Sequence, residues 1–206
     1  MLIFLVAIVS RVGVAFFFGD VATEPAMMRD QLSYHTLGVR LIGGHGFSFD
    51  EGWYPFTLPN TPTAHWSFLY SLFVAAVYAL FGVHPLAVRL IQALLGGILL
   101  PWMVYRLTRR LFAGVVPADE LEDRWQMLWG EGQGLPLLAA LLAAIYAYFV
   151  LYAALVMTET FYIIALLWSL ERAMVLVEKP TLVNGTFLGV SLGIGTLLRQ
   201  SLLPWV

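Results

Sequence analysis

The chain has 206 residues, of which 60% are hydrophobic and 12% are charged, and its formal net charge is −2 at pH 7. Soluble globular domains are roughly 45–50% apolar and 25% charged, so a soluble fold of this length would leave apolar surface uncovered. The small net charge, without a run of Lys and Arg, excludes a nucleic-acid partner. The absence of cysteine excludes disulfides and thiol catalysis. These features predict an all-α integral membrane protein.

Six apolar windows approach the roughly 20 residues that a membrane-spanning helix needs. The first, residues 1–19, lacks the charged start and the cleavage site of a signal peptide and is predicted to be a membrane helix. The other windows are residues 64–82, 85–107, 135–153, 161–177 and 182–198. A polar segment at residues 20–63 and an acidic one at residues 118–134 interrupt the series.

A short amphipathic helix is predicted inside the first polar segment. Leu37 and Leu41 are four residues apart and so lie on one helical face. Asp30 stands at the predicted start, and the paired glycines Gly43 and Gly44 end the helix. Two readings of Asp30 stay open, because aspartate commonly caps a helix and is also a catalytic base.

The positions of the basic residues leave two topologies open. Basic residues gather at the ends of two windows, at residues 106–110 and around Lys179. If all six windows crossed from an inner N-terminus, both clusters would lie outside. Either the N-terminus is outside, or window 64–82 does not cross. In the second arrangement residues 20–83 form an outer loop and residues 108–134 a cytoplasmic loop.

Four of the ionisable residues in or beside the apolar windows are candidates for function or for internal pairing. Glu159 separates two windows and is either functional or solvated among lipid headgroups. Arg199 has the guanidinium fork that suits a phosphate or carboxylate, although it also fits a side chain that reaches the interface. Arg11 and Arg89 are expected to pair inside the protein with carboxylates or carbonyls.

Histidines and glycines give weaker signals. Gly185, Gly189 and Gly193 recur every fourth residue and predict close helix packing. Four histidines lack the spacing of a zinc motif: His35, His45, His65 and His84. No metal ligands are therefore assigned, and a divalent cation stays open as a cofactor.

A series of short motifs recurs in a recognisable order. It comprises Asp30-x-x-x-Tyr34-His35-x-Leu37-Gly38, Gly44-His45-Gly46-Phe47-Ser48, Pro62-Thr63-Ala64, Leu69-Tyr70, Leu80-Phe81-Gly82, Arg89-Leu90-Ile91-Gln92, Tyr105-Arg106-Leu107-Thr108-Arg109-Arg110-Leu111-Phe112, Thr158-Glu159-Thr160 and Leu198-Arg199. Their order and spacing resemble the N-terminal half of the GT-C membrane glycosyltransferases. The resemblance is to the family 39-like group, related to dolichyl- or polyprenyl-phosphate-mannose protein mannosyltransferases and to aminoarabinose transferases of lipid A.

The resemblance implies a multi-helix transmembrane module in the cytoplasmic (plasma) membrane, with juxtamembrane helices in the first outer loop. Residues 1–206 would be its N-terminal part, with the C-terminal remainder absent. The implied reaction is inverting transfer of a sugar from a polyprenyl-phosphate donor to an acceptor on the extracytoplasmic side.

The resemblance also implies a role for each candidate site residue. Asp30 is the expected catalytic base. Glu159 matches an acidic residue of the second outer loop, and Arg199 matches an arginine that faces the donor phosphate. Tyr34, in the first motif, and His65, directly after Pro62-Thr63-Ala64, complete the substrate-binding candidates.

A non-catalytic scaffold subunit of a larger membrane complex is the alternative. Where the family shows Arg-Pro-Pro-Leu-Tyr-Pro, this chain has Trp66-Ser67-Phe68-Leu69-Tyr70-Ser71. Where the family has Arg-Pro, this chain has Arg199-Gln200. The intact Asp30, Glu159 and Arg199 favour the enzyme. A transporter is disfavoured because the charged residues gather at the membrane faces rather than mid-membrane.

Overall fold

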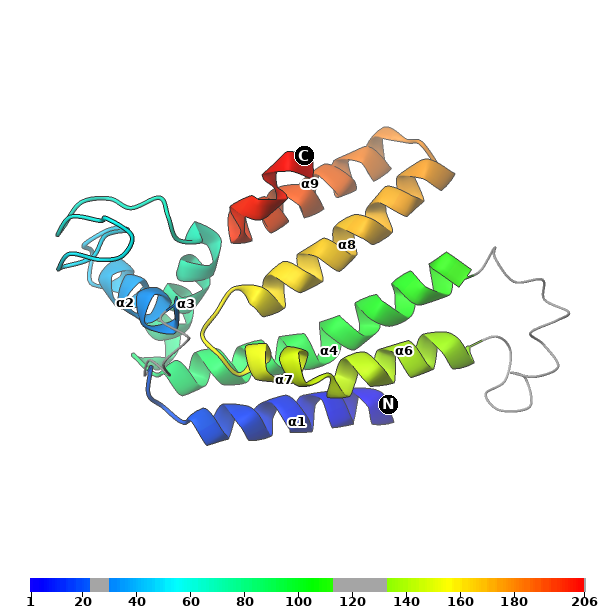
Figure 1. Cartoon of the computed structure of the whole chain (residues 1–206), viewed down its shortest axis with the longest axis horizontal. Coiled ribbons are helices and arrows are strands. Elements are labelled where there is room, and N and C mark those ends of the chain that lie inside the picture. Colours follow the sequence, from blue (N-terminus) through cyan, green and yellow to red (C-terminus); the bar gives the residue numbers. More distant parts are fainter. Residues whose placement is uncertain (23–29, 113–132, 206) are drawn as a thin grey trace, which may run out of the picture.

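A computed structural model describes residues 1–22, 30–112 and 133–205, and over these ranges the chain is helical without a β-strand (Figure 1). The elements are α1 (Leu2–Phe18), α2 (Asp30–Ile42), α3 (Phe68–Phe81), α4 (Pro85–Phe112), α6 (Gly134–Ile145), α7 (Ala147–Ala153), α8 (Glu159–Glu178), α9 (Leu182–Leu198) and the 3-10 helix η1 (Gln200–Trp205). The predicted all-α class is confirmed.

Helix α4 is the centre of the bundle, in contact with α1, α6 and α8. Two glycines allow this close packing. A Cβ atom at Gly97 would lie 2.8 Å from the Ile8 side chain on α1, and one at Gly96 would lie 2.8 Å from Thr160 on α8. Small residues therefore bring the helix backbones together at this point.

The glycine stripe on α9 does not have the role that its spacing predicts. No atom of the described structure lies within 4 Å of a Cβ built at Gly185, Gly189 or Gly193. The spacing aligns the three glycines on one face of α9, but that face meets no other described helix. The prediction of close packing at these positions is wrong for this part of the chain.

Two helices, α4 and α8, are long and apolar enough to cross a membrane. The pair α6 and α7 passes the same criterion together, although the two helices are bent by 53°, so up to three spans are present among the described residues. Helices α1, α3 and α9 are shorter apolar helices. The predicted membrane character therefore agrees with the structure at this coarse level, and the full number of crossings stays a prediction.

The bundle has two chemically different ends. We call the end that holds α2, α3 and residues 43–67 the loop end, and the end that holds Arg106, Arg110 and Glu171 the arginine end (Figure 1). The N-terminus lies toward the arginine end. Helix α4 continues through Phe112 past the predicted start of the 108–134 loop, and residues 113–132 of that loop lie outside the described residues.

Helix α3 has both of its ends at the loop end. Before it, the Ser67 hydroxyl donates to the Leu197 carbonyl at the end of α9, over 3.0 Å. After it, His84 pairs with Asp20 beyond the end of α1, over 2.6 Å. Helix α3 has only 14 residues, and it lies across the loop end rather than along the bundle (Figure 1). This arrangement is compatible with the second topology, which stays a prediction.

The apolar window 135–153, predicted as one helix, is broken in two. Tyr146 takes an extended conformation with ψ of 119°, which ends α6. The guanidinium of Arg11, fully buried on α1, donates to the carbonyls of Ala144 and Ala143 over 2.7 and 3.1 Å. A break at membrane depth is tolerated when protein groups satisfy the freed carbonyls. The prediction that Arg11 pairs internally is confirmed.

Candidate functional site

Glu159 and Arg199 form an ion pair at the loop end. Glu159 begins α8 and Arg199 follows α9, so the pairing of these two helices places them side by side. Arg199 donates from Nη1 to Glu159 Oε1 over 3.1 Å. The Glu159 side chain is 14% exposed and Arg199 44% exposed. The second oxygen, Glu159 Oε2, is buried and has no hydrogen-bond partner in the described part of the chain.

Tyr34 connects this pair to Asp30. Asp30 and Tyr34 are four residues apart on α2 and therefore share a face. Burial raises the pKa of Tyr34 to about 12, and the negative charges of Asp30 and Glu159 act in the same direction, against hydrogen bonds involving Ser67 and Thr158. The two carboxylates also interact electrostatically with each other. The Tyr34 hydroxyl therefore stays protonated at neutral pH, and the charges of both Asp30 and Glu159 act on it.

Aromatic rings surround Tyr34. Its ring meets Tyr70 edge-on at 4.8 Å and Trp66 at 5.5 Å, both centroid to centroid. His65 packs on the outer side of Trp66 at 5.1 Å and is itself exposed. The Trp66 Nε1 atom is buried and has no hydrogen-bond partner among the described residues. The structure thus brings Asp30, Tyr34, Glu159 and Arg199 together, with His65 one ring further out.

The turn that precedes Glu159 is held by α4. Gln92 donates from Nε2 to the carbonyls of Tyr152, Ala153 and Leu155, over 2.8, 3.3 and 2.7 Å. Arg89 Nε donates to the Ala154 carbonyl between them, over 3.0 Å. Four successive carbonyls are thereby satisfied where the chain leaves α7.

Arg89 pairs internally with carbonyls as the sequence predicts, whereas the role of Gln92 was missed. A signal was present, since Gln92 is the lone amide side chain of the window 85–107 and lies three residues after Arg89. Its oxygen accepts from the Tyr70 hydroxyl over 2.7 Å, so the same side chain also anchors α3. Both side chains are almost fully buried, and the turn that leads into Glu159 is consequently fixed from α4.

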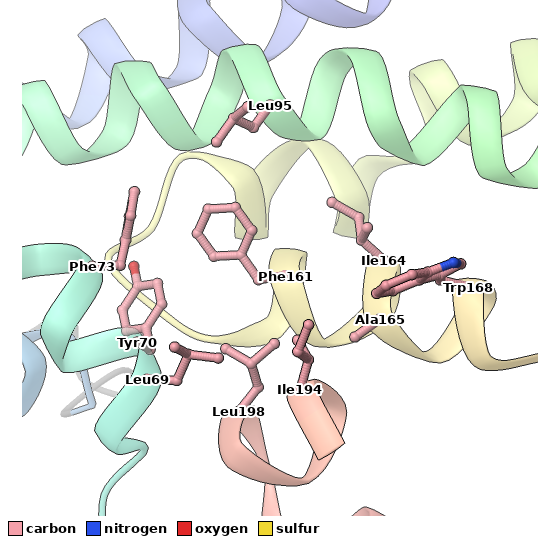
Figure 2. A pocket seen from close by; sticks show the side chains of 10 residues that line it. All are labelled: Leu69, Tyr70, Phe73, Leu95, Phe161, Ile164, Ala165, Trp168, Ile194 and Leu198. Carbon is pink, nitrogen blue, oxygen red and sulfur yellow. The ribbon is translucent and has the colours of Figure 1, made fainter. Parts of the chain in front are cut away.

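An apolar pocket of about 340 Å³ adjoins the ion pair. Side chains of α3, α4, α8 and α9 line it, among them Leu69, Leu95, Phe161 and Leu198 (Figure 2). Phe161 lies two residues after Glu159, and Leu198 directly precedes Arg199. Charged groups and a pocket for hydrocarbon are therefore neighbours at the loop end.

The arrangement combines three chemical abilities. A carboxylate can accept a proton from a hydroxyl, a guanidinium can bind an oxyanion, and the pocket can take an apolar chain. In the described ranges, no group of three or more His, Asp or Glu side chains is arranged to hold a metal ion. No family model matches the chain, and no curated protein or solved structure matches it. Its function is therefore inferred from the site itself.

Proposed function

We propose that this chain forms part of a GT-C-type membrane glycosyltransferase that transfers a sugar from a polyprenyl phosphate to an acceptor hydroxyl. One observation carries the proposal: the cluster of Asp30, Glu159 and Arg199 lies beside the apolar pocket. A polyprenyl phosphate has the matching chemistry, with an anionic head and a hydrocarbon tail joined directly. The motif order supports the same family.

In the proposed reaction, Asp30 accepts the proton of the acceptor hydroxyl as its oxygen attacks the anomeric carbon. The bond from that carbon to the phosphate oxygen breaks, and the polyprenyl phosphate leaves as an anion. The Arg199 guanidinium stabilises the negative charge that develops on it. Attack opposite the leaving group inverts the anomeric centre. Glu159 holds Arg199 toward the site through their ion pair.

The proposed sidedness follows from the two ends of the bundle. Arg106 and Arg110 lie in the last turns of α4, and Lys179 directly follows α8. These helix ends point toward the end of the bundle that also holds the N-terminus (Figure 1), and an excess of basic residues favours the cytoplasmic side. The loop end would then be extracytoplasmic. Cysteines introduced at Gly46 and Lys179 should react with an impermeant thiol reagent from opposite sides of sealed vesicles. Reaction from one side would refute this orientation.

Head and tail recognition can be tested separately with two ligands. Binding of a short-chain polyprenyl phosphate and of the corresponding polyprenol is measured by native mass spectrometry on the purified chain. Arg199→Gln should weaken binding of the phosphate roughly 10–100-fold, the value of a charge-assisted hydrogen bond of about 1.5–3 kcal/mol. Binding of the polyprenol should stay within about threefold, because it has no charge for Arg199 to bind.

Arg109→Gln is the matched control, since it removes one positive charge from the exposed surface of the arginine end. Equal losses in the two arginine variants, or equal losses for phosphate and polyprenol, would contradict the assignment of Arg199. Transfer is then assayed with a panel of polyprenyl-phosphate sugars and hydroxylated acceptors, and transfer by the wild type is the expected result.

The scaffold subunit stays the second candidate, and a specific observation favours it. Trp66 stands where the family has an arginine, and it is packed among Tyr34, Phe49 and His65. The site therefore has one cation fewer for a phosphate. A wild-type chain that neither binds polyprenyl phosphate nor transfers sugar would favour the scaffold.

A further inference from the structure

Gln31 joins the two segments that carry the acidic residues of the site. Its side chain is only 1% exposed, and it directly follows Asp30 on α2. The Gln31 Oε1 atom accepts a hydrogen bond from the Val156 amide over 3.1 Å. Val156 belongs to the turn between α7 and α8, three residues before Glu159. One hydrogen bond therefore ties the start of α2 to the turn that leads into α8.

Arg89, on α4, is the second donor to the same oxygen. Its Nη2 atom donates to Gln31 Oε1 over 3.2 Å. The Arg89 guanidinium is in turn bound to the carbonyls of Gly19, Val21 and Ala154, over 2.6, 3.0 and 3.0 Å. Because Arg89 is almost fully buried and makes several bonds, it has little freedom to move. Gln31 Oε1 is thus held by two donors on separate elements.

We infer that Gln31 is a positioning residue, which sets the separation of Asp30 and Glu159 through the shared acceptor Oε1. The catalytic part of this inference rests on the proposed function. Asp30 and Glu159 carry like charges that repel each other, and the hydrogen bonds of Gln31 hold their two segments together against this repulsion. A displacement of about 1 Å can cost about 10²-fold in rate.

The hydrogen-bond pattern of Gln31 suggests a rescue variant. Its Nε2 atom has no hydrogen-bond partner in the described ranges. Gln31→Glu keeps an accepting oxygen for both donors and removes no recorded bond. Gln31→Met has similar length and no acceptor, so it leaves the Val156 amide and one Arg89 nitrogen without this partner. A residue that merely filled space would give the opposite order, with Met tolerated at least as well as Glu.

The first readout is structural and independent of turnover. The natural chain has no cysteine, so spin labels can be placed selectively at Ile42, the last residue of α2, and at Tyr148 on α7, both exposed. The label-to-label distance distribution is measured by pulsed electron resonance. It should broaden in Gln31→Met and return to the wild-type width in Gln31→Glu. Ser169→Ala is the control, because it removes a buried hydrogen bond that stays within α8.

The second readout is the split between kcat and KM. Gln31→Met should lower kcat about 10²-fold while the KM for the donor stays within about threefold, because Arg199 and the pocket are unchanged. An unaltered distance distribution in Gln31→Met, or broadening without loss of kcat, would overturn the inference. If the Met variant does not fold, Gln31→Asn replaces it, being one methylene too short to reach both donors. A wild type without transfer would refute the proposed function alone, because the label distances would still test the tie.

Discussion

Two of the three glutamates on α8, Glu171 and Glu159, are in opposite situations. At the arginine end, Glu171 is 1% exposed, and both of its oxygens are taken: Arg106 binds Oε1 at 2.6 Å and Arg172 binds Oε2 at 2.5 Å. At the loop end, Glu159 has a single arginine partner, and its Oε2 atom has no hydrogen-bond partner among the described residues. The same residue type is therefore saturated at one end of the helix and half-satisfied at the other.

The difference indicates which acid is structural and which is available for chemistry. A buried carboxylate with both oxygens bonded stabilises the packing of α4 against α8 and has no spare acceptor. Glu159 instead lies near a pocket and a second acid, and its buried Oε2 atom has no hydrogen-bond partner among the described residues. Buried polar groups are normally satisfied, so an unsatisfied one marks a functional candidate. Three predictions test this comparison, from the largest effect to the smallest.

The largest effect is expected at Asp30. Asp30→Asn should lower sugar transfer by about 10²–10⁴-fold, the usual contribution of a positioned base. The fold should stay nearly intact, because Asp30 is the first residue of α2 and asparagine loses only the interaction of its charge with the helix dipole, about 0.3–1 kcal/mol. Transfer is measured on variants of matched thermal stability, with Asp50→Asn as the control for an exposed aspartate of the loop end. Turnover near that of the wild type would remove Asp30 from the mechanism.

Next in size is the contrast between the two glutamates themselves. Glu171→Gln should destabilise the protein by about 3 kcal/mol, because it leaves Arg106 and Arg172 without the carboxylate that they share. Glu159→Gln should cost at most about 1 kcal/mol, since Arg199 is 44% exposed and retains water. Thermal unfolding in detergent measures both losses, and Glu178→Gln controls for removing a surface partner of an arginine. Equal destabilisation by the two changes would invalidate the distinction.

The smallest effect concerns Asp20, which joins α1 to the start of α4. Its partial burial acts to raise the pKa, but hydrogen bonds from His84 and the Leu86 amide outweigh this and lower the pKa of Asp20 below 3.8. A carboxyl group whose pKa is lower in the folded state stabilises the fold at pH values above its pKa in the unfolded state. That contribution is lost as the pH falls through its pKa in the folded state. Because the side chain is 42% exposed, solvent screening keeps the effect below about 1 kcal/mol.

Asp20→Asn should therefore lower the unfolding temperature slightly at pH 6 and flatten its decline toward pH 3. Unfolding is followed by intrinsic fluorescence at several pH values between these limits. A variant that keeps the full acid dependence of the wild type would show that Asp20 does not contribute to it.

Much of the fold could be predicted from the spacing of apolar residues. The short helix α2 follows from Leu37 and Leu41, and its end from Gly43 and Gly44, the latter with φ of 76°. The break at Tyr146 could not be predicted, because the surrounding window is apolar throughout and contains no local helix breaker there. The side chain that binds the carbonyls freed at this break is Arg11, a partner more than 130 positions away in sequence.

The charged residues of the candidate site could be predicted from the sequence, but the hydrogen bonds that hold its segments in place could not. Asp30, Glu159 and Arg199 are conspicuous because ionisable residues are rare in this apolar sequence. Gln31 and Gln92 carry no charge, and their partners lie in a turn about 60 to 125 residues away. Periodicity gives the face of a helix and says nothing of which distant carbonyls that face will meet.

The contact between Arg11 and α6 has a consequence for biogenesis. Ribosomes make α1 long before α6, since Arg11 and Ala144 are 133 residues apart. Until α6 arrives, the intrahelical carbonyl of Ala7 is the one described acceptor that Arg11 has. An arginine at the centre of an inserting helix costs roughly 2.5–3.5 kcal/mol at the translocon. We therefore expect α1 to be a weak insertion signal on its own, with α6 supplying the carbonyls that bind Arg11 only later in synthesis.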